Sequence, residues 1–158
     1  MKKLPFLAVV LMLAGVLPFV VCSAGIVFFD SGVPVPKLLM MLVTYGAVSL
    51  SFMGAVHWGQ ALQTDRLIMP AGADEVDNLR LALGVVPALI GWVAAYLAYA
   101  WAPLAGVAVL VVAFALMALC ERNAWRRGWL PAGYMGVRWI VTALTECCLV
   151  MVLLVRTF

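Results

Sequence analysis

The side chains of this sequence that could do chemistry are few, and the most informative of them lie inside apolar segments. The stretch YGAVSLSFMGAVHWG, residues 45–59, carries a tyrosine, two serines, a histidine and a tryptophan. Glu146 lies nine residues from each end of another apolar segment, 137–155. An ionisable group at the centre of a membrane costs at least ~2.5 kcal/mol and is expected to face the bundle interior with a partner. We therefore predict a polar interior or ligand-facing site that draws on Tyr45, Ser49, His57, Trp58, Trp92 and Glu146.

The depths of two of these residues suggest a pair. His57 lies five residues inside one end of its segment, roughly 8 Å by helix rise, and Glu146 lies roughly 6 Å deeper. The two side chains could bridge that gap if their helices are neighbours. Pairing would then reduce the free-energy cost of the Glu146 carboxylate in lipid. The alternative is a protonated Glu146 that bonds to a serine, a threonine or a backbone carbonyl.

Catalytic and metal-binding motifs are missing from the sequence. It contains no P-loop, no GxSxG elbow, no HExxH pair and no paired-carboxylate motif. The four cysteines show neither C-x-x-C spacing nor a histidine cluster beside them. We predict no catalytic residue, no metal site, no cofactor and no enzymatic activity. An enzyme or an ion-coupled transporter would rest mainly on Glu146.

Composition identifies the elements that must position these side chains. The 158 residues are 67% hydrophobic and 11% charged, with a mean hydropathy of +1.15, whereas about a quarter of a soluble domain is charged. Continuous apolar runs exclude the alternating pattern of a β-barrel. We predict an all-α membrane protein, a bundle of five transmembrane helices in a single integral membrane domain spanning 1–158, with a kink at Pro18 and another at Pro87. The expected helices are about 4–29, 38–62, 81–99, 104–119 and 137–155.

The basic residues predict how the bundle lies in the membrane. With five spans, eight of the ten lysines and arginines fall on one side, together with the amino end and the 121–136 loop. The positive-inside rule puts that side in the cytoplasm and the carboxyl end outside. The first segment is expected to be retained as a helix, because it is too long for a typical signal peptide. The basic residues serve topology and lipid contact, so we predict the lipid bilayer as a partner and no nucleic acid. The eight are Lys2, Lys3, Arg66, Arg80, Arg122, Arg126, Arg127 and Arg138.

Small residues at helical spacing predict close packing between the second and third helices. Helices in lipid pack closely where small side chains let their backbones approach. One ridge in the second helix repeats every four residues and is widened by a glycine, and the third helix offers a matching ridge. The predicted packing residues are Ala47, Ser51, Gly54, Ala55 and Gly59 on the second helix, and Gly84, Ala88, Gly91 and Ala95 on the third.

Four stretches of the sequence also resemble a known family in order along the chain. They are LAGVLPF at 13–19, the 45–59 stretch, LGVVPALIGW at 83–92 and WLPAGYMGVRWIVT at 129–142. They are similar to the transmembrane-protein-69-like family, small integral membrane proteins of bacteria and mitochondria-bearing eukaryotes built on a domain of unknown function. The resemblance implies a membrane location and a helical fold. Within the family, this sequence is most similar to a bacterial inner-membrane member.

The resemblance assigns no role to any residue. Members of that family often carry a second glycine where this sequence has Ala55, and an arginine where it has His57. These departures argue against His57 as a catalytic group common to the family.

Two functions from different classes remain open at this stage. The first is a non-catalytic assembly factor or small subunit that contacts other membrane proteins, suggested by short loops and small-residue packing surfaces. The alternative is a binder or carrier of a hydrophobic small molecule such as a quinone, a lipid or a tetrapyrrole. An open cavity that reaches Glu146 would favour the second function, and tight packing would favour the first.

Overall fold

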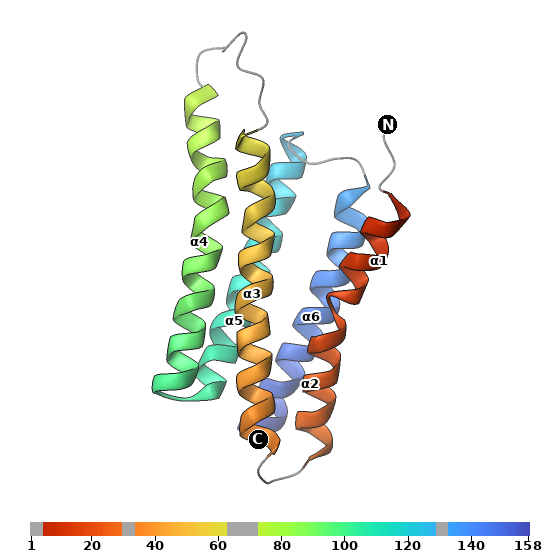
Figure 1. Cartoon of the computed structure of the whole chain (residues 1–158), viewed down its shortest axis with the longest axis vertical. Coiled ribbons are helices and arrows are strands. Elements are labelled where there is room, and N and C mark those ends of the chain that lie inside the picture. Colours follow the sequence, from red (N-terminus) through yellow and green to blue (C-terminus); the bar gives the residue numbers. More distant parts are fainter. Residues whose placement is uncertain (1–4, 30–33, 63–72, 129–132) are drawn as a thin grey trace.

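Helices make up nearly all of the part of the chain that is described. The computed structural model describes residues 5–29, 34–62, 73–128 and 133–158, and within these residues it contains helices and no strands (Figure 1). The helices are α1 (Phe6–Ala14), α2 (Leu17–Phe28), α3 (Pro34–Leu62), α4 (Ala73–Ala100), α5 (Pro103–Arg126) and α6 (Tyr134–Thr157). Together, α1 and α2 form one span, so that five helices are long and apolar enough to cross a membrane. The predicted all-helical, five-span membrane fold is confirmed.

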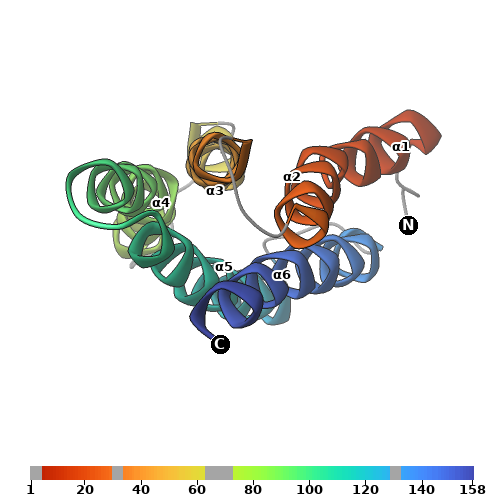
Figure 2. The same ribbon diagram turned by 90° about the horizontal axis from the view of Figure 1, so that it is seen from below.

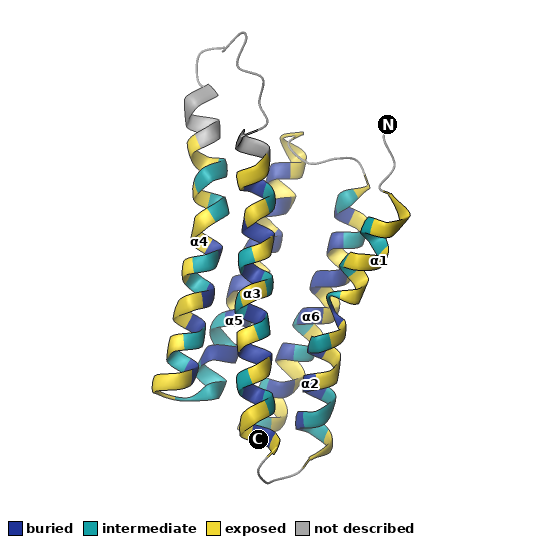
Figure 3. Ribbon diagram, viewed as in Figure 1, coloured by how far each residue is buried: buried dark blue, intermediate teal, exposed yellow. Residues whose placement is uncertain are grey.

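The exposed surface of the bundle is apolar, as a lipid-facing surface must be. Large hydrophobic side chains such as Phe52 and Trp92 are exposed at 75% and 66%. Buried and exposed residues alternate along α2, α3, α4, α5 and α6, so that their buried faces point toward neighbouring helices, whereas α1 has no buried residue (Figure 3). Apolar side chains can face lipid without cost, so the bundle needs no polar surface within the membrane.

The first span is interrupted near its middle, where the sequence predicts a kink. Helix α1 ends at Ala14, and α2 begins at Leu17 with Pro18 in its first turn. Proline is well tolerated at that position, because the N–H it lacks would have no partner within the helix. The hydroxyl of Tyr45 in α3 donates a hydrogen bond of 2.8 Å to the carbonyl of Gly15 at the interruption. Helix α4, in contrast, continues through Pro87 without a break.

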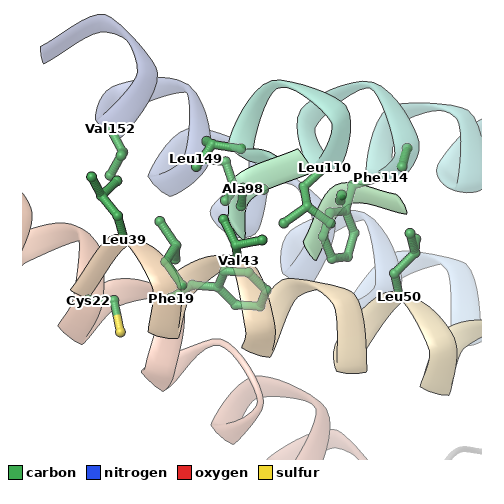
Figure 4. Packing of buried hydrophobic residues seen from close by; sticks show 14 of the residues in the cluster. Phe19, Cys22, Leu39, Val43, Leu50, Ala98, Leu110, Phe114, Leu149 and Val152 are labelled. Carbon is green, nitrogen blue, oxygen red and sulfur yellow. The ribbon is translucent and has the colours of Figure 1, made fainter. Parts of the chain in front are cut away.

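The five spans are arranged in a ring. Following it around, α3 packs on α4, α4 on α5, α5 on α6, α6 on α2, and α2 again on α3, while α3 also contacts α5 across the middle (Figure 2). The sequential helices α4 and α5 form a hairpin with only Trp101 and Ala102 between them. The core of the ring is filled by side chains such as Phe19, Leu110 and Phe114 (Figure 4).

Helices α3 and α4 approach most closely at two glycines. A Cβ atom added at Gly54 would lie 2.5 Å from the carbonyl oxygen of Gly84. A Cβ atom added at Gly91 would lie 2.9 Å from the carbonyl oxygen of Ala47. Backbone therefore faces backbone at both places, and a side chain on either glycine would force the helices apart.

The helices extend further into the polar residues than the apolar runs indicate. Helix α5 continues to Arg126, beyond the expected end at residue 119, and α6 begins at Tyr134. Glu121, which the sequence assigned to a loop, is therefore helical and buried. Arg138, which was counted among the basic residues that set topology, lies at the same end of the bundle but is only 5% exposed. The loop assignment of Glu121 was wrong because a helix buried against other helices continues through charged residues when those residues find partners.

Candidate functional site

A cavity of about 340 Å³ opens between α1, α3 and α6. In Figure 1, α1 leans away from α3 in this half of the bundle. Leu11, Val48 and Phe52 at the cavity are themselves highly exposed, so the cavity opens sideways toward lipid. We call it the lateral cavity. Its lining consists of Leu11, Met12, Gly15, Phe19, Tyr45, Val48, Ser49, Phe52, Met53, Val56, Tyr134, Arg138, Val141 and Thr145.

One end of the lateral cavity lies deep in the bundle, at the interruption between α1 and α2. Tyr45 bonds to Gly15 there, and its ring meets that of Phe19 edge to face with centroids 5.1 Å apart. Phe19 in turn meets Phe114 edge to face at 5.9 Å. These rigid contacts make the deep end apolar and fix its shape.

The other end of the lateral cavity is charged. It lies toward what we call the basic end of the bundle, where α1, α4 and α6 begin and α3 and α5 end. Arg138 of α6 donates from Nε to Oε2 of Glu121 in α5 at 2.5 Å, and the exposed fractions of the two side chains are 7% and 1%. The guanidinium also donates from Nη2 to the sulfur of Met53, and the Tyr134 hydroxyl interacts with the same carboxylate.

His57 lies within electrostatic range of Arg138 and makes no hydrogen bond to Glu146. Its side chain is fully buried, and the guanidinium groups of Arg138 and Arg80 act on its imidazole. Neither ring nitrogen has a hydrogen-bond partner within the described residues. Polar groups from α3, α4, α5 and α6 thus converge at the basic end of the bundle.

The predicted pair of His57 and Glu146 is not present in the structure. Glu146 lies eight residues beyond Arg138 along α6, which is about 12 Å further from the basic end. It is half-buried against α5, where it contacts the backbone of Ala115. Oε1 of Glu146 has no hydrogen-bond partner within the described residues, so the alternative interpretation, a protonated Glu146 that bonds to a serine, a threonine or a backbone carbonyl, stays a prediction.

Of the remaining predicted site residues, two share the lateral cavity and the two tryptophans lie outside its lining. Tyr45 and Ser49 line the lateral cavity. Trp58 packs against Gly84 of α4 and is 42% exposed. Trp92 lies on the exposed face of α4, where its ring stacks on Tyr96 with centroids 5.9 Å apart.

Sequence reasoning missed Glu121, Arg138 and Tyr134 as site residues, although a signal for the ion pair exists. Glu121 lies five residues before the end of α5, and Arg138 lies four residues after the start of α6. Consecutive helices in an up-and-down bundle are antiparallel, so residues equally far from their connection lie at the same depth. Opposite charges at such positions predict a pair across the hairpin.

The chemistry available here is recognition of an amphipathic molecule. The described residues include no group of three or more His, Cys, Asp or Glu side chains that could hold a metal ion. The lateral cavity instead combines a long apolar wall with hydroxyl and guanidinium donors at one end. Binding sites for small molecules commonly have this composition, with a few polar groups that fix orientation.

Comparison with known proteins places the chain in a family. Residues 4–154 match the family described as "Protein of unknown function (DUF3429)". The chain is also 37% identical over 94 residues to Transmembrane protein 69 of Xenopus tropicalis. That match covers 60% of this chain and 34% of the relative, so the chain spans about a third of that protein. No solved structure matches the chain. A multi-pass membrane protein of five spans, this chain belongs to the DUF3429 family, as its resemblance to transmembrane-protein-69-like proteins implies.

Proposed function

We propose that this protein binds an amphipathic small molecule in the lateral cavity, with the polar head near Arg138 and Tyr134 and the apolar body between α1, α3 and α6. The observation that supports this function best is the cavity itself, about 340 Å³ and open toward lipid. A molecule dissolved in the bilayer could enter it without passing through water. The lining of this cavity does not include Glu146, so the criterion that the sequence suggested is not met. The open cavity beside Arg138 is instead the reason why we favour binding of a hydrophobic ligand over the assembly-factor role.

The dimensions of the lateral cavity suit the chain of a membrane amphiphile. Its lining runs from Tyr45 to Val56 along α3 and from Tyr134 to Thr145 along α6. Each stretch advances eleven residues, or about 16 Å, which is roughly half of a ~30 Å hydrocarbon core. A ligand that fills the cavity would thus span about one leaflet.

An assembly-factor role is the second candidate, and the exposed face of α4 supports it. Trp92, Tyr96 and Tyr99 follow helical spacing and are all more than half exposed. Aromatic side chains are enriched in the contact surfaces of protein complexes. Recovery of a stoichiometric membrane-protein partner in mild detergent, lost on Trp92→Ala, would favour this function.

Ligand retention tests the proposed function directly. We expect the wild-type protein, purified in a mild detergent, to carry one amphiphile per chain in native mass spectrometry. Ser49→Phe should abolish retention, because the added ring fills the lateral cavity. Thr44→Phe adds the same ring to an exposed position of α3 outside the lining and should leave retention unchanged. If the wild-type protein retains nothing, and shows no thermal shift with quinones, tetrapyrroles or lipids, the proposal is wrong.

The location and orientation that we propose rest on charge. Arg122, Arg126 and Arg127 are exposed at the basic end of the bundle, and Lys37 and Arg156 are the basic residues assigned to the opposite side. The positive-inside rule then favours a bacterial inner membrane with the basic end, and so the amino end, in the cytoplasm.

Reporter fusions test this orientation. A cytoplasm-active reporter joined after Gly128 should be active, and the same reporter joined after Phe158 should be inactive. A periplasm-active reporter should give the reverse pattern at both positions. Equal activity of one reporter at the two positions would contradict a membrane crossing by α6, the helix between Gly128 and Phe158.

A further inference from the structure

We propose that the amphiphile in the lateral cavity carries an anionic head group, a phosphate or a carboxylate, and that the guanidinium of Arg138 binds it. This inference rests on the proposed function and narrows the class of ligand. It separates acidic lipids and fatty acids from the neutral quinones that the cavity could otherwise hold.

The charges around the lateral cavity support an anion. Among the described residues that line it, Arg138 is the one charged side chain, and neither Glu121 nor Glu146 belongs to the lining. Glu121 belongs to α5, which contributes no residue to the lining. A ligand in the cavity therefore meets a cation and hydroxyl groups, with the balancing carboxylate held away from it.

Not all N–H groups of Arg138 are used in the hydrogen bonds that it makes within the described residues. Its Nε donates to Glu121, and its Nη2 donates to the sulfur of Met53, which is a weak acceptor. A guanidinium carries five N–H groups in a planar fork that matches the oxygens of a phosphate or carboxylate. Within the described part of the chain, Glu121 is the one oxygen acceptor recorded for Arg138, so other N–H groups can receive an anion.

Arg138 lies in a buried polar cluster, where its interactions with charged groups are weakly screened. The fully buried His57 lies in the field of Arg138 and of Arg80, and its two ring nitrogens have no partner within the described residues. Little of this cluster is exposed to solvent, so its electrostatic interactions are weakly screened.

The depth of Arg138 matches that of a lipid head group. It lies four residues from the start of α6, or about 6 Å by helix rise. From there the apolar lining continues to Thr145 and to Tyr45 at the deep end. An acidic amphiphile can thus place its charge at the basic end and its chain along the cavity.

Glu121 and the ligand would bind the same guanidinium. Glu121→Gln keeps the size of the side chain and removes its charge, so it should preserve or increase the affinity for an anion. The double variant Glu121→Gln/Arg138→Gln removes both charges together, which avoids a lone buried charge and should preserve the fold. Loss of the guanidinium should weaken binding of an anionic amphiphile at least tenfold, because charge-assisted hydrogen bonds are lost.

The experiment compares head groups on the full chain in neutral detergent. The measurements are the ligand-induced shift of the unfolding midpoint and the dissociation constant from titration. The probes are phosphatidylglycerol, oleate, phosphatidylcholine, a short-chain ubiquinone and inorganic phosphate. We expect phosphatidylglycerol and oleate to raise the midpoint of the wild-type protein and of Glu121→Gln, and to lose this effect in the double variant and in Ser49→Phe.

A second arginine serves as the matched control. Arg156 lies at the other end of α6, where its Nη2 donates to the carbonyls of Ile26 and Phe29 at 2.5 Å each. Arg156→Gln removes the same charge outside the lateral cavity. It should lower the midpoint of the free protein and leave the shift caused by phosphatidylglycerol unchanged.

Each contrary outcome has a distinct meaning. If ubiquinone or phosphatidylcholine binds, Ser49→Phe blocks it, and the anionic probes do not bind, the head-group inference is wrong while the proposed function stands. If inorganic phosphate alone gives the full shift, the ligand is a free anion and the amphiphile is excluded. If phosphatidylglycerol binds the double variant as tightly as the wild-type protein, Arg138 is not the recognition group.

Discussion

Arg138→Gln is expected to lower the free energy of unfolding by about 3–5 kcal/mol, the usual cost of removing one partner of a buried ion pair. Glu121 is fully buried and 2.5 Å from the guanidinium, so the substitution leaves a carboxylate without its counter-ion. The loss is greater than that of a surface pair, because neither water nor salt can replace the arginine. Unfolding by SDS in mixed micelles would measure the change.

A double-mutant cycle provides the control for this prediction. Glu121→Gln alone should also destabilise the protein, because it leaves Arg138 without its carboxylate. The double variant Glu121→Gln/Arg138→Gln should be more stable than the sum of the two single losses predicts, since no buried charge remains. Strictly additive losses would show that the two side chains do not stabilise each other.

Gly54→Ala is expected to destabilise the bundle by about 1–3 kcal/mol, the usual cost of overpacking a tight core. The new Cβ atom would lie 2.5 Å from the carbonyl oxygen of Gly84 and 3.2 Å from that of Leu83. Both obstacles are backbone, which cannot rotate away as a side chain can. Helices α3 and α4 must therefore separate, and the contact that holds them together is weakened.

The matched control lies on the same helix. Gly59 is five residues further along α3 and has no atom within 4 Å of an added Cβ, so its prediction as a packing residue was wrong. Gly59→Ala should be neutral or slightly stabilising, because alanine favours a helix over glycine by up to about 1 kcal/mol. Equal effects of the two substitutions on SDS-driven unfolding would count against a close approach of the helices at Gly54.

The sequence alone determined the class of the protein and the number of its spans. Apolar runs of about 20 residues predict transmembrane helices directly, because the thickness of the bilayer sets the number of apolar residues that each helix needs. Pro18 predicted the interruption of the first span for an equally local reason, since proline cannot donate a backbone hydrogen bond. These features depend only on residues close together along the chain.

The tertiary structure decided which polar groups meet. Hydropathy orders residues by depth, and it placed His57 nearer the basic end than Glu146, but depth does not say which sides of two helices face each other. Packing placed His57 within electrostatic range of Arg138 and put Glu146 against α5. It also buried Glu121, because the paired charges allow α5 to continue beyond the apolar run.

The lateral cavity depends on the lean of α1 relative to α3, which no single segment of the sequence encodes. Contacts between distant helices come from the complementary shapes and charges of several faces at once, and those faces meet only in the folded bundle.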